Sequence, residues 1–342
     1  MPTNRAAWQD EAGIKLSIRS TPYETELATN QILVKVQAWA INPCDYMLQD
    51  VALPFVKYPV ILGEDIAGTV VSTGSSAATR FKTNDRVLAF AKGTTGGPAM
   101  GGFQEYVIVD ADTASPIPTW ISFAEASVFP LAICSSALAL FSSQMLGLPL
   151  PQIEKPETDS GKYLLVWGGS SALGSNAIQM ARAAGLDVLS TASERNFEHV
   201  KKLGASMVFD YSSESVVDDI VAELDSRDPG LCAGIFHAAG NVEPCLQIAA
   251  KTKGAPFVAS SVPIPENKVP SGVRAKMVFG DGQDDIVCKI YGEFLPRALA
   301  ERRYVVAPEP LIIQTKGLEG IQEGYEVLKK GVSARKVVVE AE

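Results

Sequence analysis

Short apolar runs alternate with amphipathic segments of helical length in the middle of the chain. The five residues of Tyr163–Trp167 are too few for a helix and are followed by two glycines, so they predict a buried strand that ends in a tight turn. From Ala172 to Ala184 apolar residues recur at helical spacing, and Gly185 follows where a C-terminal cap is expected. A strand, a glycine turn and a helix in this order predict a phosphate-binding unit.

The same alternation continues beyond this unit. Further strands are expected at 187–191, 207–209, 233–237 and 256–260, with helices at 196–203 and 213–224. Strands that alternate with helices at this spacing predict a doubly wound parallel sheet, and therefore an α/β fold class.

The first 110 residues have a different pattern, because short β-rich runs are separated by Gly, Pro and Asn. Strands are expected at 15–20, 31–40, 66–71, 86–90 and 104–110. This spacing predicts a small barrel-like β domain, in which the glycine-rich segment 92–102 is either a lid or a surface hairpin. Two helices that meet at Pro130 (121–144) predict a hinge, and 317–339 predicts a helix, a turn and a closing strand.

The length, hydrophobic content, net charge and cysteines of the chain restrict the classes of protein to which it can belong. A chain of 342 residues with 46% hydrophobic residues predicts two domains. The net charge of −9 argues against binding to nucleic acid or to an anionic membrane. The first residues lack the apolar core of a signal peptide, and we find no uncharged apolar stretch of 18 residues, so we expect a cytoplasmic protein with no membrane partner. Five cysteines without a Cys-x-x-Cys pair predict reduced thiols.

Three motifs together resemble the medium-chain dehydrogenase/reductase superfamily. They are Ala-Ile-Asn-Pro-Cys-Asp (40–45), Gly-Glu-Asp-Ile-Ala-Gly (63–68) and Val-Trp-Gly-Gly-Ser-Ser-Ala-Leu-Gly (166–174). Within it the chain looks most like the zinc-free quinone oxidoreductase and enoyl reductase branch, and especially like fungal trans-acting enoyl reductases of polyketide pathways. The resemblance implies a GroES-like β-barrel catalytic domain (1–122 and 297–342) and a doubly wound parallel Rossmann nucleotide-binding domain (123–296).

The resemblance also allows a prediction about zinc. Zinc-dependent members have cysteine, histidine and cysteine ligands where this chain has Asn42, Glu64 and Leu131. The four-cysteine structural lobe is also missing, so we predict that no metal is bound. His199 and His237 are interpreted as a helix-surface residue and a sheet-end residue.

The expected cofactor is NADPH. NAD-binding members place an acid at the end of the second strand, where this chain has Thr191, and Arg195 nearby could pair with a 2′-phosphate. Ser193 could donate a hydroxyl, and Tyr211 matches a family tyrosine near that phosphate. The predicted cofactor-binding residues are Gly168, Gly169, Ser170, Ser171, Ala172, Leu173, Gly174, Ser193, Arg195, Tyr211, Ala239 and Val258.

The predicted catalytic residues are Asn42, Tyr46 and Ser135. The resemblance places Asn42 and Ser135 beside the nicotinamide. Without a metal to polarise an alcohol, the favoured reaction is hydride transfer to the β-carbon of an α,β-unsaturated carbonyl or enoyl thioester. Many relatives have a lysine where this chain has Met47, which leaves protonation to Tyr46 or water.

The expected substrate is a small-molecule or carrier-bound enoyl group, and a polyketide synthase is the candidate partner. Two alternatives stay open. The protein could be an NADPH quinone oxidoreductase, or a non-catalytic NADPH-binding structural or stress protein.

Overall fold

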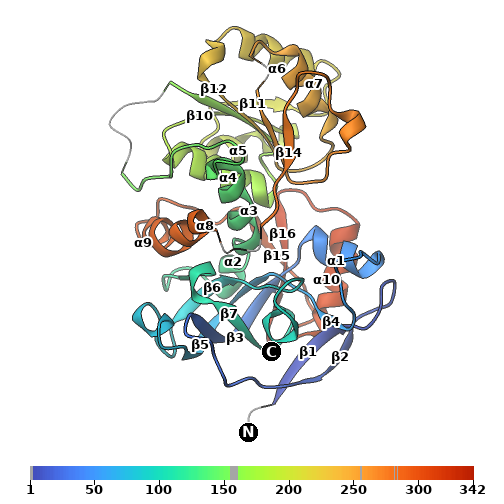
Figure 1. Ribbon diagram of the computed structural model, residues 1–342, viewed down its shortest axis with the longest axis vertical. Coiled ribbons are helices and arrows are strands. Elements are labelled where there is room, and N and C mark those ends of the chain that lie inside the picture. Colours follow the sequence, from blue (N-terminus) through green and yellow to red (C-terminus); the bar gives the residue numbers. More distant parts are fainter. Residues whose placement is uncertain (1–2, 155–160, 255, 281, 283) are drawn as a thin grey trace. The chain divides into compact units, whose positions relative to one another are not determined.

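A computed structural model describes residues 3–154, 161–254, 256–280, 282 and 284–342 (Figure 1). The Pro, Glu and Thr content of residues 148–160 predicts an exposed loop, and part of this segment lies outside the described residues. The chain forms two compact units. Unit 1 comprises Met1–Leu131, Asp281–Arg302 and Val306–Glu342, and unit 2 comprises Ala132–Gly280 and Arg303–Val305. The domain boundaries expected from the sequence, at 122/123 and 296/297, stay a prediction.

Unit 2 contains a parallel sheet with the strand order β11-β10-β9-β12-β13-β14. The strands are β9 (Tyr163–Trp167), β10 (Asp187–Ala192), β11 (Met207–Asp210), β12 (Cys232–His237), β13 (Val258–Ser260) and β14 (Ala275–Met277). The helices are α3 (Pro130–Phe141), α4 (Ala172–Ala183), α5 (Phe197–Lys202), α6 (Val216–Asp225) and α7 (Glu243–Lys251). The predicted doubly wound sheet is confirmed. β14 was not expected, because three residues around an exposed lysine carry little strand signal.

The sheet is covered by helices on both faces. Side chains of α6 and α7, such as Ile220 and Leu246, share a buried core with Leu165 of β9 and Ile235 of β12. The helices α4 and α5 lie together away from this pair in Figure 1. Because β10 and β12 flank β9, the chain moves outward from β9 in both directions, and the carboxyl ends of these strands share one edge.

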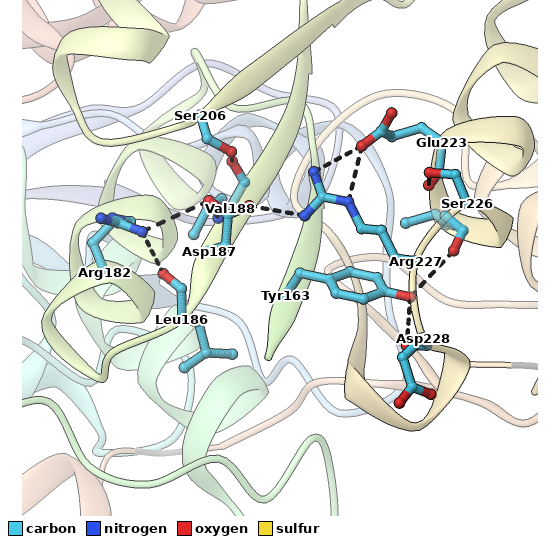
Figure 2. A network of polar contacts seen from close by, with 11 residues as sticks. Tyr163, Arg182, Leu186, Asp187, Val188, Ser206, Glu223, Ser226, Arg227 and Asp228 are labelled. Carbon is cyan, nitrogen blue, oxygen red and sulfur yellow. Dashed lines mark hydrogen bonds and ion pairs between the residues drawn. The ribbon is translucent and has the colours of Figure 1, made fainter. Parts of the chain in front are cut away.

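The opposite edge of the sheet, where the strands begin, carries a network of charged groups (Figure 2). Asp187 at the start of β10 accepts from Arg227 at 2.9 Å, and Arg227 also pairs with Glu223 at 2.7 Å. Arg182 lies 3.7 Å from Asp187. Burial alone would raise the pKa of Asp187, but hydrogen bonds from Arg227 and Ser206 and the neighbouring cations lower it. The network therefore stabilises the amino edge of the sheet.

Unit 1 contains a three-stranded sheet, β2-β1-β4, and a seven-stranded sheet, β15-β16-β3-β5-β6-β8 with β7 paired to β3. The strands are β1 (Asn4–Gln9), β2 (Ser17–Thr21), β3 (Gln31–Ala40), β4 (Val60–Ile61), β5 (Asp65–Thr73), β6 (Arg86–Phe90), β7 (Tyr106–Asp110), β8 (Ala114–Pro116), β15 (Glu309–Ile312) and β16 (Arg335–Glu340). The expected strands are found. The strands β1, β4, β8 and β15 were not expected.

The helices of unit 1 are short. They are α1 (Pro43–Asp50), α2 (Phe123–Ala126), α8 (Asp285–Lys289), a π-helical turn (Ile290–Phe294), α9 (Leu295–Ala300) and α10 (Glu319–Lys329). The predicted break at Pro130 is confirmed, because α2 ends at Ala126 and α3 begins at Pro130.

The glycine-rich segment 92–102 packs closely on neighbouring backbone. The N–H of Gly102 donates to the carbonyl of Gly63 at 2.8 Å, and a Cβ at Gly101 would lie 2.1 Å from the carbonyl oxygen of Ile61. At its other end the buried ammonium of Lys92 pairs with Asp110 at 2.6 Å. These contacts favour the hairpin interpretation over a lid.

The segment Phe123–Phe141 is long and apolar enough to cross a membrane by length and composition, contrary to our expectation that no such stretch exists. However, 78% of the most apolar stretch of 18 residues within this segment is buried inside the protein. This burial is the pattern of a helix in a protein core.

Candidate functional site

The glycine turn between β9 and α4 is shaped by close backbone approach. Gly168 has a φ of +85°, which favours glycine. A Cβ at Gly169 would lie 2.1 Å from Ser190 Oγ, and one at Gly174 would lie 2.2 Å from the carbonyl oxygen of Gly168. Ser171 caps α4, because its hydroxyl accepts from the N–H of Gly174 at 3.0 Å. A narrow glycine turn at the N-terminus of a twelve-residue helix fits a dinucleotide pyrophosphate.

Thr191 at the end of β10 holds this turn in place. Its buried hydroxyl accepts from the N–H of Gly168 at 3.0 Å, and its carbonyl accepts from the N–H of Gly169 at 2.8 Å. Thr191 stands where NAD-binding members have an acid, and its side chain is therefore hydrogen-bonded to the glycine turn.

The three residues predicted to recognise a 2′-phosphate follow the carboxyl ends of β10 and β11. Arg195 is exposed, Ser193 is half-buried, and the side chain of Tyr211 is 51% exposed. Glu194 is also exposed. The structure thus leaves a cation and a phenol exposed beside the strand ends, whereas the hydroxyl of Ser193 accepts from the side-chain amide of Asn196 at 3.0 Å. The role of these groups toward a phosphate stays a prediction.

His237 connects the ends of β12 and β13. Its buried ring lies 3.2 Å from the hydroxyl of Ser260 and 3.1 Å from the carbonyl of Gly240. Burial lowers the pKa of His237, although backbone hydrogen bonds oppose the shift. The sheet-end interpretation is confirmed. His199 is half-buried on α5, so its helix-surface interpretation holds only in part.

Two other predicted cofactor residues differ in their placement. Ala239 follows the carboxyl end of β12 and backs onto Gly168, since a Cβ on that glycine would lie 3.1 Å from the Ala239 Cβ. We expected the segment 258–262 to end its strand with its backbone toward the cofactor, and β13 does end within this segment, at Ser260, while the cofactor contact of Val258 stays a prediction. Val258 begins β13 and its side chain is buried in the core, because the strand is only three residues long. Ser260 occupies the carboxyl end instead.

Ser135 lies half-buried on α3, beside a contact that the sequence did not reveal. The next residue, Ser136, donates its hydroxyl to the carbonyl of Leu173 at the start of α4, at 2.9 Å. α3 is therefore fixed against the first turn of α4, and Ser135 lies next to the fixed point. A nicotinamide contact by Ser135 stays a prediction.

Asn42 in unit 1 is bound into a buried polar cluster. Its side chain is 2% exposed, and its amide nitrogen donates to Asp65 Oδ2 at 2.9 Å. The ammonium of Lys336 on β16 donates to Asn42 Oδ1 and lies 2.8 Å from Asp65 Oδ2. The other oxygen of Asp65 accepts from the N–H of Leu131 at 2.5 Å. The proposed nicotinamide contact of Asn42 is untested, but its orientation is set by Lys336 and Asp65.

Sequence reasoning missed Lys336. The available signal was a lysine within the valine-rich strand Arg335–Glu340, at a position that proves to be 5% exposed. A buried ammonium requires an anionic or polar partner, and Asp65 directly before the apolar run of β5 was the candidate.

Additional acids adjoin this cluster. Asp45 accepts from the backbone N–H of Asn42 at 2.7 Å, and the thiol of Cys44 lies 3.8 Å from Glu64 Oε2. Burial and the charge of Asp65 raise the pKa of Asp45 to about 7. Burial and the charges of Asp45 and Asp65 raise the pKa of Glu64 to about 8.

The side chains of Tyr46 and Met47 lie in different environments. Tyr46 is half-buried and packs against the core of unit 1, and the ammonium of Lys329 lies 5.6 Å from its ring centroid. Met47, which replaces the family's lysine, is 56% exposed. These contacts favour a packing role for Tyr46, and its role as a proton donor stays a prediction.

Among the residues that the structure describes, no group of three or more His, Cys, Asp or Glu side chains is arranged to hold a metal ion. At the Asn42 position, a divalent cation would also have to displace the ammonium of Lys336.

Comparisons with known proteins agree with this architecture. Residues 28–119 match the alcohol dehydrogenase GroES-like domain. The chain is 42% identical to dehydrogenase azaJ of Aspergillus niger over 99% of both proteins. It is 36% identical to trans-enoyl reductase himH of Aspergillus japonicus, over 98% of this chain and 97% of the relative. The fold is similar to that of a quinone oxidoreductase from Coxiella burnetii, with a TM-score of 0.74, 24% identity and 100% of both chains covered.

The relatives match over nearly the whole chain, and they are named dehydrogenases and enoyl reductases. The protein is thus an oxidoreductase with an α/β fold, and its Rossmann sheet implies a nicotinamide cofactor. The chain belongs to the medium-chain dehydrogenase/reductase superfamily, in the group that contains fungal dehydrogenases and trans-enoyl reductases.

Proposed function

We propose that the protein is an NADPH-dependent, zinc-independent enoyl reductase. The observation that carries this proposal is the pairing of Asn42 with Lys336, because an amide held by an ammonium occupies a zinc-ligand position of the superfamily. A reductase without a Lewis acid is best suited to a conjugated alkene, whose reduction places negative charge on a carbonyl oxygen that hydrogen bonds can stabilise. The names of relatives such as himH support the same reaction class.

When bound, the reduced nicotinamide supplies a hydride. The glycine turn before α4 would hold the pyrophosphate, and Arg195 with Ser193 and Tyr211 would hold the 2′-phosphate. The substrate would be a polyketide-type enoyl group, free or on a carrier protein, and a polyketide synthase is the proposed partner.

The reaction is tested with NADPH deuterated at the transferred position and a panel of enoyl thioesters, simple enones and quinones. Deuterium at the β-carbon of the product is expected. Turnover of quinones alone would instead establish a quinone oxidoreductase. No turnover with any acceptor would favour a non-catalytic NADPH-binding protein.

Cofactor preference is tested with Arg195→Ala. A charge-assisted hydrogen bond contributes about 1.5–3 kcal/mol, so NADPH binding should weaken on the order of tenfold or more while NADH binding stays nearly unchanged. Lys202→Ala, which removes an exposed cation on α5, is the matched control. An equal loss for both cofactors would contradict the assignment.

Metal independence has its own measurement. Elemental analysis of the purified protein should give well under one zinc per chain, and chelators should not inhibit. A stoichiometric zinc that chelators remove together with activity would refute this part of the proposal.

A further inference from the structure

His237 is a buried titratable residue of unit 2 that the proposed function does not use. It ends β12, and both His237 and Ser260, which ends β13, are 0% exposed. A fully buried imidazole needs partners for both ring nitrogens, because an unpaired polar atom in a core costs free energy. Here Nε2 lies 3.1 Å from the carbonyl oxygen of Gly240, and Nδ1 lies 3.2 Å from Ser260 Oγ. The ring therefore joins two turns, residues 238–240 after β12 and 260–262 after β13.

The carbonyl of Gly240 determines which ring nitrogen carries the proton. A carbonyl oxygen can only accept, so Nε2 must donate to it, and in a neutral ring Nδ1 is then left as an acceptor for the Ser260 hydroxyl. Burial lowers the pKa of His237, and the causes that oppose this shift are hydrogen bonds with the backbone. We therefore expect a neutral ring that is protonated on Nε2 at pH 7.

Two further hydrogen bonds connect the same turns. The N–H of Ser261 donates to the carbonyl of His237 at 2.9 Å, and the hydroxyl of Ser261 donates to the carbonyl of Ala238 at 3.2 Å. These bonds join the turns at the strand ends. The ring of His237 carries the connection on to Gly240, at the far end of the first turn.

The turn at 238–240 lies against the glycine turn that would hold the pyrophosphate. A Cβ on Gly168 would lie only 3.1 Å from the Cβ of Ala239. Ala239 is half-buried and Gly240 is exposed, whereas the His237 ring is fully buried. A ligand at this edge would therefore meet the backbone of the turn, and His237 would act on the ligand through that backbone.

The strand order indicates which half of a dinucleotide would lie here. The helix α4 follows the central strand β9, and the residues proposed to hold the 2′-phosphate follow β10 and β11 on one side of it. A Rossmann sheet binds the two nucleotides on opposite sides of the point where the strand order reverses. The nicotinamide half would therefore lie toward β12 and β13, whose ends His237 joins.

We propose that His237 is a positioning residue for the nicotinamide end of the cofactor. Its two ring nitrogens hold the turns after β12 and β13 in the shape that receives the nicotinamide, and the imidazole itself does not touch the cofactor. This inference rests on the nicotinamide cofactor of the proposed function, and it is independent of the acceptor that is reduced. Loss of the ring contacts should therefore weaken binding of the nicotinamide end and spare the adenosine end.

The first test compares NADPH with 2′-phospho-ADP-ribose, which lacks the nicotinamide ring. In titration calorimetry, His237→Leu should bind NADPH on the order of tenfold more weakly, because two hydrogen bonds that hold the turns are lost. It should bind 2′-phospho-ADP-ribose like wild type, which also shows that the variant is folded. His237→Gln, whose amide can donate to Gly240 in place of Nε2, should recover part of the loss. Arg195→Ala is the matched comparison at the other end of the cofactor, because it should weaken both ligands.

A second test observes the ring directly. The chain has two histidines, so the NMR signals of His237 in protein with isotope-labelled histidine are identified by their absence in His237→Gln. At pH 7 the proton should reside on Nε2 and not on Nδ1. NADPH should shift these signals, and 2′-phospho-ADP-ribose should leave them nearly unchanged.

Three results would overturn the proposal. They are an equal loss of both ligands in His237→Leu, which is the result of a purely structural role, wild-type NADPH binding by His237→Leu, and a neutral ring protonated on Nδ1. NADH and ADP-ribose should show the same difference as NADPH and 2′-phospho-ADP-ribose, so an error in the assigned cofactor preference does not change the outcome. A wild-type protein that binds neither NADPH nor NADH would instead contradict the proposed function, and His237 would have no such role.

Discussion

Two charged clusters of this protein differ in composition and in burial. At the amino edge of the Rossmann sheet, Arg182 and Arg227 face Asp187 and Glu223, so positive and negative groups balance (Figure 2). In unit 1, Lys336 is the single cation described among three carboxyls, those of Asp45, Glu64 and Asp65. The first cluster lowers the pKa of its aspartate, whereas the second raises two carboxyl pKa values to about 7 and 8.

This difference in charge balance distinguishes a cluster that stabilises the fold from a cluster that can take part in proton transfer. A balanced and partly exposed network gains modestly from each pair and releases no proton at neutral pH. An unbalanced buried cluster costs stability when its acids ionise, and it keeps acids that titrate near neutral pH. Charge imbalance, more than the number of charges, marks the unit 1 cluster as the functional candidate.

The largest effect is expected from Lys336→Met. Removing the ammonium leaves Asp65 buried without its cation, and breaking a buried ion pair on one side costs about 3–5 kcal/mol. Urea denaturation should show this loss in the free energy of unfolding. Asp65→Asn combined with Lys336→Met should recover much of it, and a single variant as stable as wild type would show that the pair is not needed.

The pH dependence of stability should have opposite signs in the two clusters. Asp45 and Glu64 have raised pKa values in the folded state, so their contribution is complete below about pH 4 and is lost as the pH rises through about 7 and 8. Asp187 has a lowered pKa, so its contribution is present above about pH 4 and is lost below.

Unfolding free energies of wild type, Asp45→Asn with Glu64→Gln, and Asp187→Asn should be measured from pH 3 to pH 9. The double variant should lose the decline that wild type shows between about pH 4 and pH 8, on the order of 2 kcal/mol once shared titration and the partial exposure of Glu64 are allowed for. Asp187→Asn should lose only the acid-side decline. If the free energies of unfolding of all three proteins changed with pH in parallel, the two clusters would not differ as proposed.

A smaller effect is expected from Arg227→Met. The guanidinium connects β10 to the end of α6 through Asp187 and Glu223, and its charged hydrogen bonds are partly exposed, so the loss should be about 1–2 kcal/mol. Urea unfolding at pH 7 measures it. The difference from wild type should shrink as the pH falls through the lowered pKa of Asp187 and its carboxylate becomes protonated. An unchanged difference there would point to lost packing against Tyr163 instead.

The smallest effect is expected from Arg335→Met, next to Lys336 in the sequence. Arg335 pairs with Glu309 at 2.9 Å on the surface, with 47% of its side chain exposed. An exposed pair contributes about 0–1 kcal/mol, so the free energy of unfolding should change little. A loss as large as that of Lys336→Met would show that β16, and not the buried ion pair, determines both results.

Much of the fold could be predicted because its signals are local. The apolar run before Gly168, the helical periodicity after it and the alternation that follows require no distant contact, and they correctly predict the sheet of unit 2. The strands that were missed are short or polar. β14 has three residues, and β1 places the polar residues Asn4 and Gln9 in the core.

The candidate site was less predictable, because its key contacts are long-range. Nothing near Asn42 indicates that its amide meets Lys336. The Rossmann resemblance identified the position of Thr191, but only the structure shows that its hydroxyl holds Gly168. The raised pKa of Glu64 follows from which acids surround it and where Lys336 lies.

The discontinuity of unit 1 has a consequence for biosynthesis. Asn42 and Lys336 are 294 residues apart, and unit 2 lies between them in the chain. A ribosome therefore completes residues 132–280 of unit 2 before it makes β16, which pairs with β3 and brings the ammonium to Asp65. Until then β3 lacks one neighbouring strand and Asp65 lacks its cation, so the nascent chain has an open strand edge and an acid that disfavours burial. Docking of β16 is then the event that closes the sheet and permits the acid cluster to become buried.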